Sequence, residues 1–120
     1  MTVVTVVSGG DGAARERAIA AHVDPRIANA AIIEGLPDGR ALLENAAQGL
    51  SLQVLRVTPG CPCCTGNLTM RVTLNRVLRH APACLYLSIA NATHKAQVVN
   101  FLQEQQYQEH LTLGPELVCD

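Results

Sequence analysis

Three cysteines, Cys61, Cys63 and Cys64, lie within four residues near the middle of the chain. Pro62 separates the first two, and glycines at positions 60 and 66 flank the cluster. An apolar run precedes these residues and a helix-like run follows them, which predicts an exposed turn between a strand and a helix N-terminus. Because that end of a helix carries a partial positive charge, it lowers thiol pKa values and favours the thiolate. Thiolates bind soft metal ions or attack disulfides.

Two functions fit such a turn. In the first, Cys61, Cys63 and Cys64 hold zinc, or another soft or borderline ion, as thiolates. Water, a partner's ligand or a histidine (His94 or His110) would complete the site. Because structural zinc sites normally have four protein ligands, an open fourth position would suit metal transfer. The alternative is a thiol-redox or non-catalytic interaction module, in which Cys61 pairs with Cys64. A third interpretation is that the three thiols pack as small buried hydrophobic groups.

Composition limits the other functions. The 120 residues are 48% hydrophobic and 16% charged, which predicts one packed domain spanning residues 1–120. A net charge of −1 and only three aromatic residues disfavour nucleic acid as a partner. We expect no membrane span or signal peptide, and five cysteines fit a secreted disulfide framework poorly. We therefore expect a cytoplasmic location, with Cys84 and Cys119 in the core.

Apolar and amphipathic segments alternate along the chain. Apolar runs predict strands at 3–7, 30–33, 52–57, 84–89 and 111–118, the last of them interrupted by Gly114 and Pro115. Helical spacing predicts helices at 13–22, 40–48, 69–79 and 95–106. Strands that alternate with helices form parallel sheets through right-handed crossovers. We therefore predict an α/β fold, with a parallel sheet of about five strands and helices on both faces.

The glycine loop after the first strand and the thiol turn after the third suggest a family. The turn reads Gly-Cys-x-Cys-Cys-Thr, at Gly60, Cys61, Cys63, Cys64 and Thr65. Together these features resemble the CobW family of P-loop GTPases, which act as metallochaperones or metal-insertion proteins. The family's thiolates hold zinc or cobalt, and nucleotide turnover drives metal delivery. The resemblance implies a P-loop NTPase-like fold over residues 3–120, which corresponds to the first half to two-thirds of a family GTPase domain.

The phosphate loop departs from the family pattern. A P-loop reads G-x-x-x-x-G-K-[ST]: backbone N–H groups wrap the phosphates, the lysine reaches the β- and γ-oxygens, and the hydroxyl binds Mg²⁺. The candidate phosphate-binding residues here are Gly9, Gly12 and Arg15, while Ala14 and Glu16 stand at the second glycine and the hydroxyl position. Ala14 adds a Cβ where positive φ is often needed, and Arg15 is larger than lysine and planar. We expect the Glu16 carboxylate to complement the helix dipole in place of a phosphate.

Two further segments have lost family residues. The family carries a Glu-Thr-Thr/Ser-Gly-type run after the fourth strand, where this chain reads Leu-Ser-Ile-Ala-Asn at 87–91. After the second strand, Asn-Glu-x-Gly is reduced to Ile-Glu-Gly at 33–35. We therefore predict a CobW-like zinc-binding protein that has lost GTP hydrolysis and serves metal handling or partner regulation. GTP is not expected as a cofactor, and the expected partners are the metal ion and either a protein client or a second copy of the chain.

Overall fold

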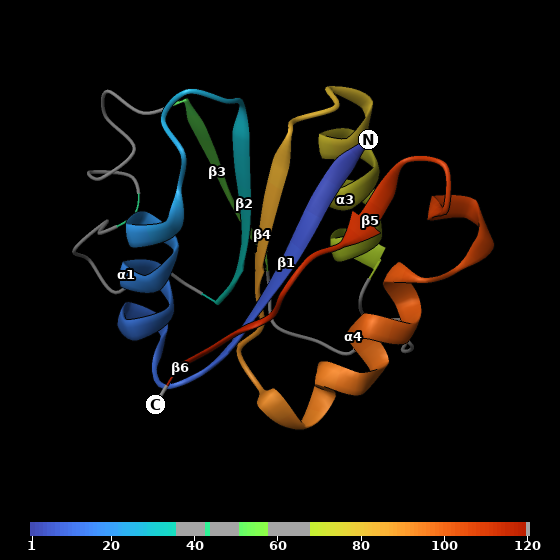
Figure 1. The fold of residues 1–120 in the computed structure, drawn as a ribbon. Coiled ribbons are helices and arrows are strands. Elements are labelled where there is room, and N and C mark those ends of the chain that lie inside the picture. Colours follow the sequence, from blue (N-terminus) through green and yellow to red (C-terminus); the bar gives the residue numbers. More distant parts are fainter. Residues whose placement is uncertain (36–42, 44–50, 58–67, 120) are drawn as a thin grey trace.

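A central sheet organises the computed structural model, which describes residues 1–35, 43, 51–57 and 68–119 (Figure 1). The strands are β1 (Thr2–Gly9), β2 (Asn29–Glu34), β3 (Leu52–Val57), β4 (Cys84–Ser88), β5 (Leu111–Leu113) and β6 (Leu117–Cys119). The helices are α1 (Gly12–His22), α3 (Leu68–Arg79) and α4 (Lys95–Leu102), with short 3-10 helices η2 (Ala92–His94) and η3 (Gln105–Tyr107). The element types agree with those that the sequence predicts for these residues, whereas the predicted helix at 40–48 falls almost entirely outside the described residues.

The strands run in the order β3-β2-β4-β1-β5, and β6 also pairs with β1. Every pairing between the described strands is parallel. All six residues of β2, which lies between β3 and β4, are buried, as expected of a strand covered on both faces. The predicted α/β fold with a parallel sheet is thereby confirmed, with six strands where about five were expected.

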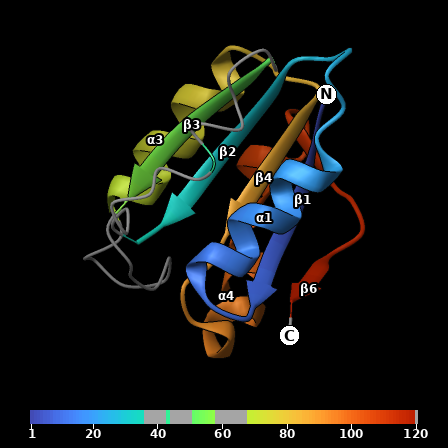
Figure 2. The same ribbon diagram turned by 90° about the vertical axis from the view of Figure 1, so that its left-hand side faces the viewer.

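Alternating side chains of β1 divide the core into two layers. Val4 and Val6 belong to the cluster that includes Leu74 of α3 and Phe101 of α4. Val7 belongs to the second cluster, with Ile19 of α1. Figures 1 and 2 show the same arrangement, with α1 on one face of the sheet and α3 and α4 on the other. The prediction of helices on both faces is therefore confirmed.

The fourth predicted helix ends earlier than the sequence suggested. Helix α4 stops at Leu102, and Glu104 has extended backbone (φ −59°, ψ 147°) before η3 begins. This break brings Tyr107 back against Phe101, with the ring centroids 5.3 Å apart at an interplanar angle of 66°. The predicted helix at 95–106 was therefore too long, because edge-to-face packing and burial of Tyr107 outweigh the helical preference of the glutamine-rich segment.

The last predicted strand is divided in two, as the Gly114-Pro115 interruption suggested. β5 pairs with the beginning of β1 and β6 with its end. Opposite Cys119, Gly9 has a φ of +81°, and a Cβ at this position would clash with the Cys119 carbonyl oxygen. Glycine is therefore required here by both backbone conformation and close strand approach. None of the helices in the described part of the chain has the length and apolar character needed to cross a membrane.

Candidate functional site

The carboxyl ends of β1 and β4 form the topological switch point of the sheet. These strands are neighbours, but the chain leaves β1 through α1 on one face and leaves β4 through α4 on the other. In open α/β sheets, ligands bind outside the strand ends where the connections diverge in this way. The switch point, defined by Gly9, Gly10 and Ser88 at the strand ends, is therefore the candidate functional site.

The side chain of Arg15 occupies the switch point. Its Nη1 donates hydrogen bonds to the carbonyl oxygens of Gly9 (3.0 Å) and Gly10 (2.9 Å), and its Nε donates to the Ser88 hydroxyl (3.0 Å). Only 6% of Arg15 is exposed. Hydrogen bonds to a charged donor are stronger than neutral ones, and here they compensate for the burial of the guanidinium. Arg15 thus joins the ends of β1 and β4 from inside the protein.

The loop between β1 and α1 is too short to wrap around a phosphate group. β1 ends at Gly9 and α1 already begins at Gly12. The N-terminus of α1 is capped by the Asp11 carboxylate, which accepts a 2.7 Å hydrogen bond from the Ala14 N–H. The Arg15 N–H donates to the Asp11 carbonyl oxygen. Two of the N–H groups in the first turn, those of Ala14 and Arg15, are therefore used within the helix and its cap and do not face a phosphate.

Two expectations about this loop were wrong, namely that the Ala14 Cβ would conflict with the backbone conformation and that the Glu16 carboxylate would complement the helix dipole. Ala14 lies inside α1, and among the described non-glycine residues only Ala81 has a positive φ, so the Ala14 Cβ causes no backbone strain. Positive φ occurs instead at Gly9 and Gly10. The carboxylate at the helix N-terminus belongs to Asp11 and not to Glu16, because the helix starts two residues before Ala14.

Glu16 instead forms a largely buried ion pair with Arg56 of β3. The distance from Arg56 Nη2 to Glu16 Oε1 is 2.7 Å, and the two side chains are 15% and 9% exposed. The same carboxylate oxygen accepts a 3.4 Å hydrogen bond from the backbone N–H of Leu43. The carboxylate that replaces the expected hydroxyl therefore connects α1 to β3 and does not point toward a phosphate site.

Glu34 and Ser88 are further buried polar residues at this edge, and the sequence analysis assigned neither of them a role. Glu34 is 5% exposed, and its carboxylate accepts a hydrogen bond from the Ala90 N–H (3.1 Å). Ser88 is fully buried and bonds Arg15. Arg56, in the mostly apolar strand 52–57, offered a usable signal, because a charge in a partly buried strand favours an ionic partner.

The predicted thiol ligands Cys61, Cys63 and Cys64 lie outside the described residues. His94 is half-buried and follows the carboxyl end of β4, whereas His110 is exposed at the opposite, amino-terminal edge, where its carbonyl accepts from the Thr2 N–H. The two candidate fourth ligands are thus at opposite ends of the sheet. Within the described ranges, no group of three or more His, Cys, Asp or Glu side chains is placed to hold a metal.

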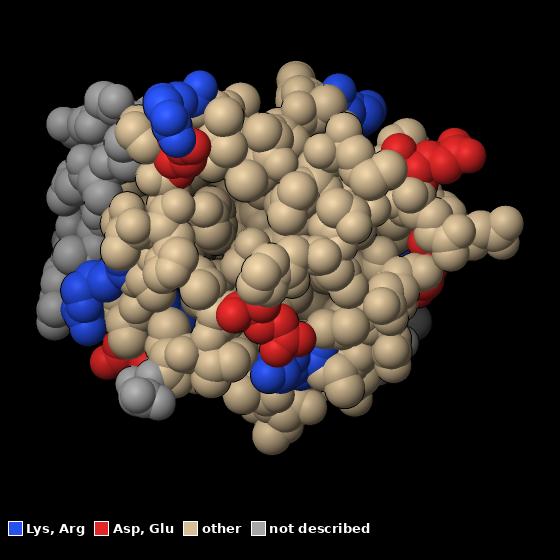
Figure 3. Space-filling model, viewed as in Figure 1, with Lys and Arg blue, Asp and Glu red and all other residues tan. Residues whose placement is uncertain are grey.

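Cys84 and Cys119 are half-buried free thiols that pack against the core cluster on the α1 face, which broadly agrees with their expected core positions. Charged side chains on the face seen in Figure 3 are scattered, with both signs close together. This distribution offers no broad basic surface on that face, as expected from the net charge of −1. Comparison of the chain with protein-family models, with curated proteins and with solved structures gives no match.

Proposed function

We propose that this chain is a CobW-like protein that does not hydrolyse GTP and that holds a zinc-type ion through Cys61, Cys63 and Cys64. β3 runs parallel to β2, and β2 to β4, so β3, the strand that precedes the thiols in the sequence, ends at the same edge as the switch point. That edge is where α/β proteins place their ligands. The edge at which β3 ends therefore supports a functional role for the thiols that follow it in the sequence.

The observation that carries the non-hydrolytic part of the proposal is the hydrogen bonding of Arg15. To contact a phosphate, Arg15 would have to release the carbonyl oxygens of Gly9 and Gly10 and leave the buried Ser88 hydroxyl without this donor. The Asp11 carboxylate at the N-terminus of α1 would also repel a phosphate at the place where helix N–H groups normally attract one. Both features favour a switch point that serves the stability of the fold.

The metal part of the proposal rests on ligand chemistry. Three thiolates suit zinc and other soft or borderline ions, and they leave one position for water, a partner's ligand or a histidine. Of the two candidate histidines, His94 is the one that follows a strand's carboxyl end. An incomplete protein ligand set would allow the metal to pass to a client or to regulate a partner.

Calorimetric titration with zinc tests the proposal. We expect one zinc per chain for the wild type and none for the Cys61→Ser/Cys63→Ser/Cys64→Ser variant, because the variant lacks all three sulfur ligands. The control Cys84→Ser/Cys119→Ser, which removes the two thiols that pack against the core, should bind zinc as the wild type does. Equal zinc binding by the triple variant and the wild type would contradict the proposal, and a disulfide formed under mild oxidation without zinc binding would favour the thiol-redox alternative.

The same preparation, titrated with GTP and Mg²⁺, tests the non-hydrolytic assignment. No saturable binding is expected, because Arg15 and the α1 N-terminus are already engaged within the protein. Saturable GTP binding in the micromolar range would overturn this part of the proposal, while leaving the zinc measurement to be judged separately.

A further inference from the structure

A groove of about 390 Å³ lies beside β5, the last strand in the order β3-β2-β4-β1-β5. On the outer side of β5 no further strand lies among the described residues. The groove is lined by the end of α4, by the segment that follows it and by all three residues of β5, namely Leu102, Gln103, Gln108, Leu111, Thr112 and Leu113. An open strand edge and a groove thus occur side by side.

The pairing of β5 with β1 fixes the direction of each backbone group in β5. The His110 carbonyl oxygen accepts a hydrogen bond from β1 (3.0 Å), and the Gly114 N–H donates one to β1 (2.9 Å). Backbone groups in a strand point to alternate sides from one residue to the next, so Thr112 also faces β1. Leu111 and Leu113 therefore direct their N–H and C=O groups outward, where an added strand would meet them.

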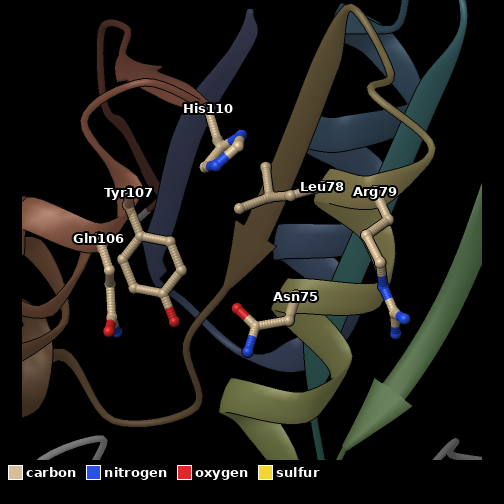
Figure 4. A pocket seen from close by; sticks show the side chains of 6 residues that line it. All are labelled: Asn75, Leu78, Arg79, Gln106, Tyr107 and His110. Carbon is tan, nitrogen blue, oxygen red and sulfur yellow. The ribbon is translucent and has the colours of Figure 1, made fainter.

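The wall of the groove opposite β5 is held in place from its other side. Residues within the segment 103–110 line both the groove and a second pocket, of about 460 Å³, that adjoins α3 (Figure 4). In that pocket Tyr107 is directed toward Asn75 of α3, and its ring packs edge-to-face on Phe101. Because Tyr107 is only 3% exposed, it anchors the segment to the core. The groove is therefore formed before a partner binds, as is usual for binding sites.

The lining of the groove suits an extended chain with alternating apolar side chains. Leu111 is buried and Leu113 partly buried against the core cluster on the α3 and α4 face, so both side chains lie on the same side of the sheet. They give the groove an apolar floor. Gln103 and Gln108 are exposed, and their amides can both donate and accept hydrogen bonds.

Charges next to the groove are acidic. None of the six lining residues is charged, and Glu104 and Glu109 each directly follow a lining glutamine. Glu104 lies 3.5 Å from Arg71, whereas Glu109 is exposed and has no ion pair among the described residues. In Figure 3 the surface over β5 is uncharged, and acidic side chains lie to its right. This distribution favours a ligand that carries Lys or Arg over one that carries Asp or Glu.

A second copy of the chain fits this edge less well than a single peptide strand. Figure 1 shows the segment between α4 and β5 extending beyond β5 on the outer side of the sheet. In an antiparallel pairing of two β5 strands, the segments of both copies would meet on the same face and collide. A single strand has no such segment and fits between β5 and the wall.

We propose that β5 and this groove bind an extended basic peptide of a partner protein, which joins the sheet as a strand next to β5. The peptide backbone forms hydrogen bonds with Leu111 and Leu113, and alternate side chains of the peptide enter the groove. A basic side chain of the peptide lies near Glu109. The site is independent of the proposed metal function.

Titration of the ¹⁵N-labelled protein with the peptide acetyl-Arg-Val-Thr-Val-Thr-Val-Arg-amide, followed by NMR, tests the proposal. We expect saturable shifts at Gln103 and Gln108, with a Kd on the order of 0.1–1 mM. Hydrogen exchange of the Leu111 and Leu113 amides should slow several-fold, whereas the Thr112 amide, which already faces β1, should change little. No saturation by about 5 mM peptide would overturn the proposal. Dimerisation of the free protein with these two amides protected would also overturn it, because a second copy would then occupy the edge.

Two methylated peptides test the strand pairing. One carries N-methyl groups on both threonines and the other on the last two valines, so that only one of them has its methyl groups on the side facing β5. That peptide should bind at least about tenfold more weakly, because it loses N–H donors at the strand interface, while the other should bind as the unmodified peptide does. Equal binding by the two methylated peptides would overturn the strand pairing.

Charge changes test the chemistry of the partner. At low salt, a peptide with glutamates in place of both arginines should bind several times more weakly. Glu109→Lys, at an exposed position, should weaken binding of the arginine peptide about threefold without lowering the Tm of the free protein. The control Asp24→Asn changes a carboxylate that precedes β2 and should leave binding unchanged. Equal binding of the arginine and glutamate peptides would overturn the assignment of a basic partner.

Discussion

Arg15 is the residue that holds the loop between β1 and α1 in place. A lysine at this position in a P-loop points toward phosphate, whereas the Arg15 side chain turns inward to two carbonyl oxygens and the Ser88 hydroxyl. The planar guanidinium can donate to several acceptors at fixed angles, which a single ammonium group cannot do. Where a P-loop lysine would contact a ligand, Arg15 thus makes an internal contact that joins β1 and β4.

Replacing Arg15 tests this role. We expect Arg15→Ala to lower the free energy of unfolding by about 2–4 kcal/mol, because three hydrogen bonds to a charged donor are lost inside the protein. The measurement is urea unfolding followed by circular dichroism. Arg17→Ala, at an exposed position of the same helix, is the matched control and should change stability by less than about 0.5 kcal/mol. An Arg15→Ala effect no larger than that of the control would show that the side chain does not join the strands.

The sequence showed which residues of the loop after β1 differ from the P-loop pattern, but not where their side chains go. The direction of Arg15 depends on Ser88, which is 73 residues away and reaches the loop only because β4 pairs with β1. Likewise, the partner of Glu16 is set by the position of β3. Such contacts between distant segments are not encoded in local spacing. The sequence could therefore show that the loop departs from the P-loop pattern, but not which contacts its side chains make.

At the scale of elements, the pair Glu16–Arg56 connects α1 to β3, at the edge of the sheet. The two elements are far apart in the sequence, and the N–H of Leu43 donates to the same carboxylate. A buried ion pair contributes little net stability against apolar replacements, but the loss of one partner is costly. We therefore interpret the pair as fixing the position of α1 over the sheet.

A double-mutant cycle measures this connection. Glu16→Gln alone should lower the free energy of unfolding by about 2–3 kcal/mol, because it removes the charge of the carboxylate that pairs with Arg56 at 2.7 Å. The cycle with Arg56→Met should give a coupling energy of at least about 1 kcal/mol. The half-exposed pair Lys95–Glu116 is the control, and its Lys95→Met/Glu116→Gln cycle should give less than about 0.5 kcal/mol. Similar coupling for the two pairs would argue against a special role for Glu16.

The sequence patterns predicted the helices and strands correctly wherever the local preference of a segment agrees with its packing in the fold. β3 has the bounds that its apolar run predicted, 52–57, and Gly114 and Pro115 did divide the last strand. The end of α4 was not predictable, because it depends on Phe101 providing a surface for Tyr107. The spacing of apolar residues describes the helical preference of one segment at a time. The end of α4 is instead caused by the packing of two segments against each other.

At the scale of the whole molecule, each of the two core layers contains one of the two tyrosines. Tyr86 belongs to the cluster on the α1 face and Tyr107 to the cluster on the α3 and α4 face. Burial raises the pKa of both phenols above the ordinary value. Each phenol therefore keeps its proton in the folded chain at a pH at which the unfolded chain has lost it.

Stability should consequently fall in alkaline solution. Above about pH 10 the unfolded state binds fewer protons than the folded state, so the free energy of unfolding decreases by up to about 1.4 kcal/mol per pH unit for each tyrosine. Urea unfolding between pH 8 and 11 measures this slope, and Tyr86→Phe/Tyr107→Phe should flatten it. The chain has only two tyrosines. If the double variant shows the same slope as the wild type, groups other than the tyrosines cause the loss of stability at alkaline pH and the prediction is wrong.

The central claim is that the thiols of Cys61, Cys63 and Cys64 bind the metal directly. X-ray absorption at the zinc edge, measured on the protein loaded with one equivalent of zinc, identifies the atoms bound to the ion. The account predicts about three sulfur atoms at about 2.3 Å and one lighter ligand. A first shell of only nitrogen and oxygen atoms near 2.0–2.1 Å would contradict it.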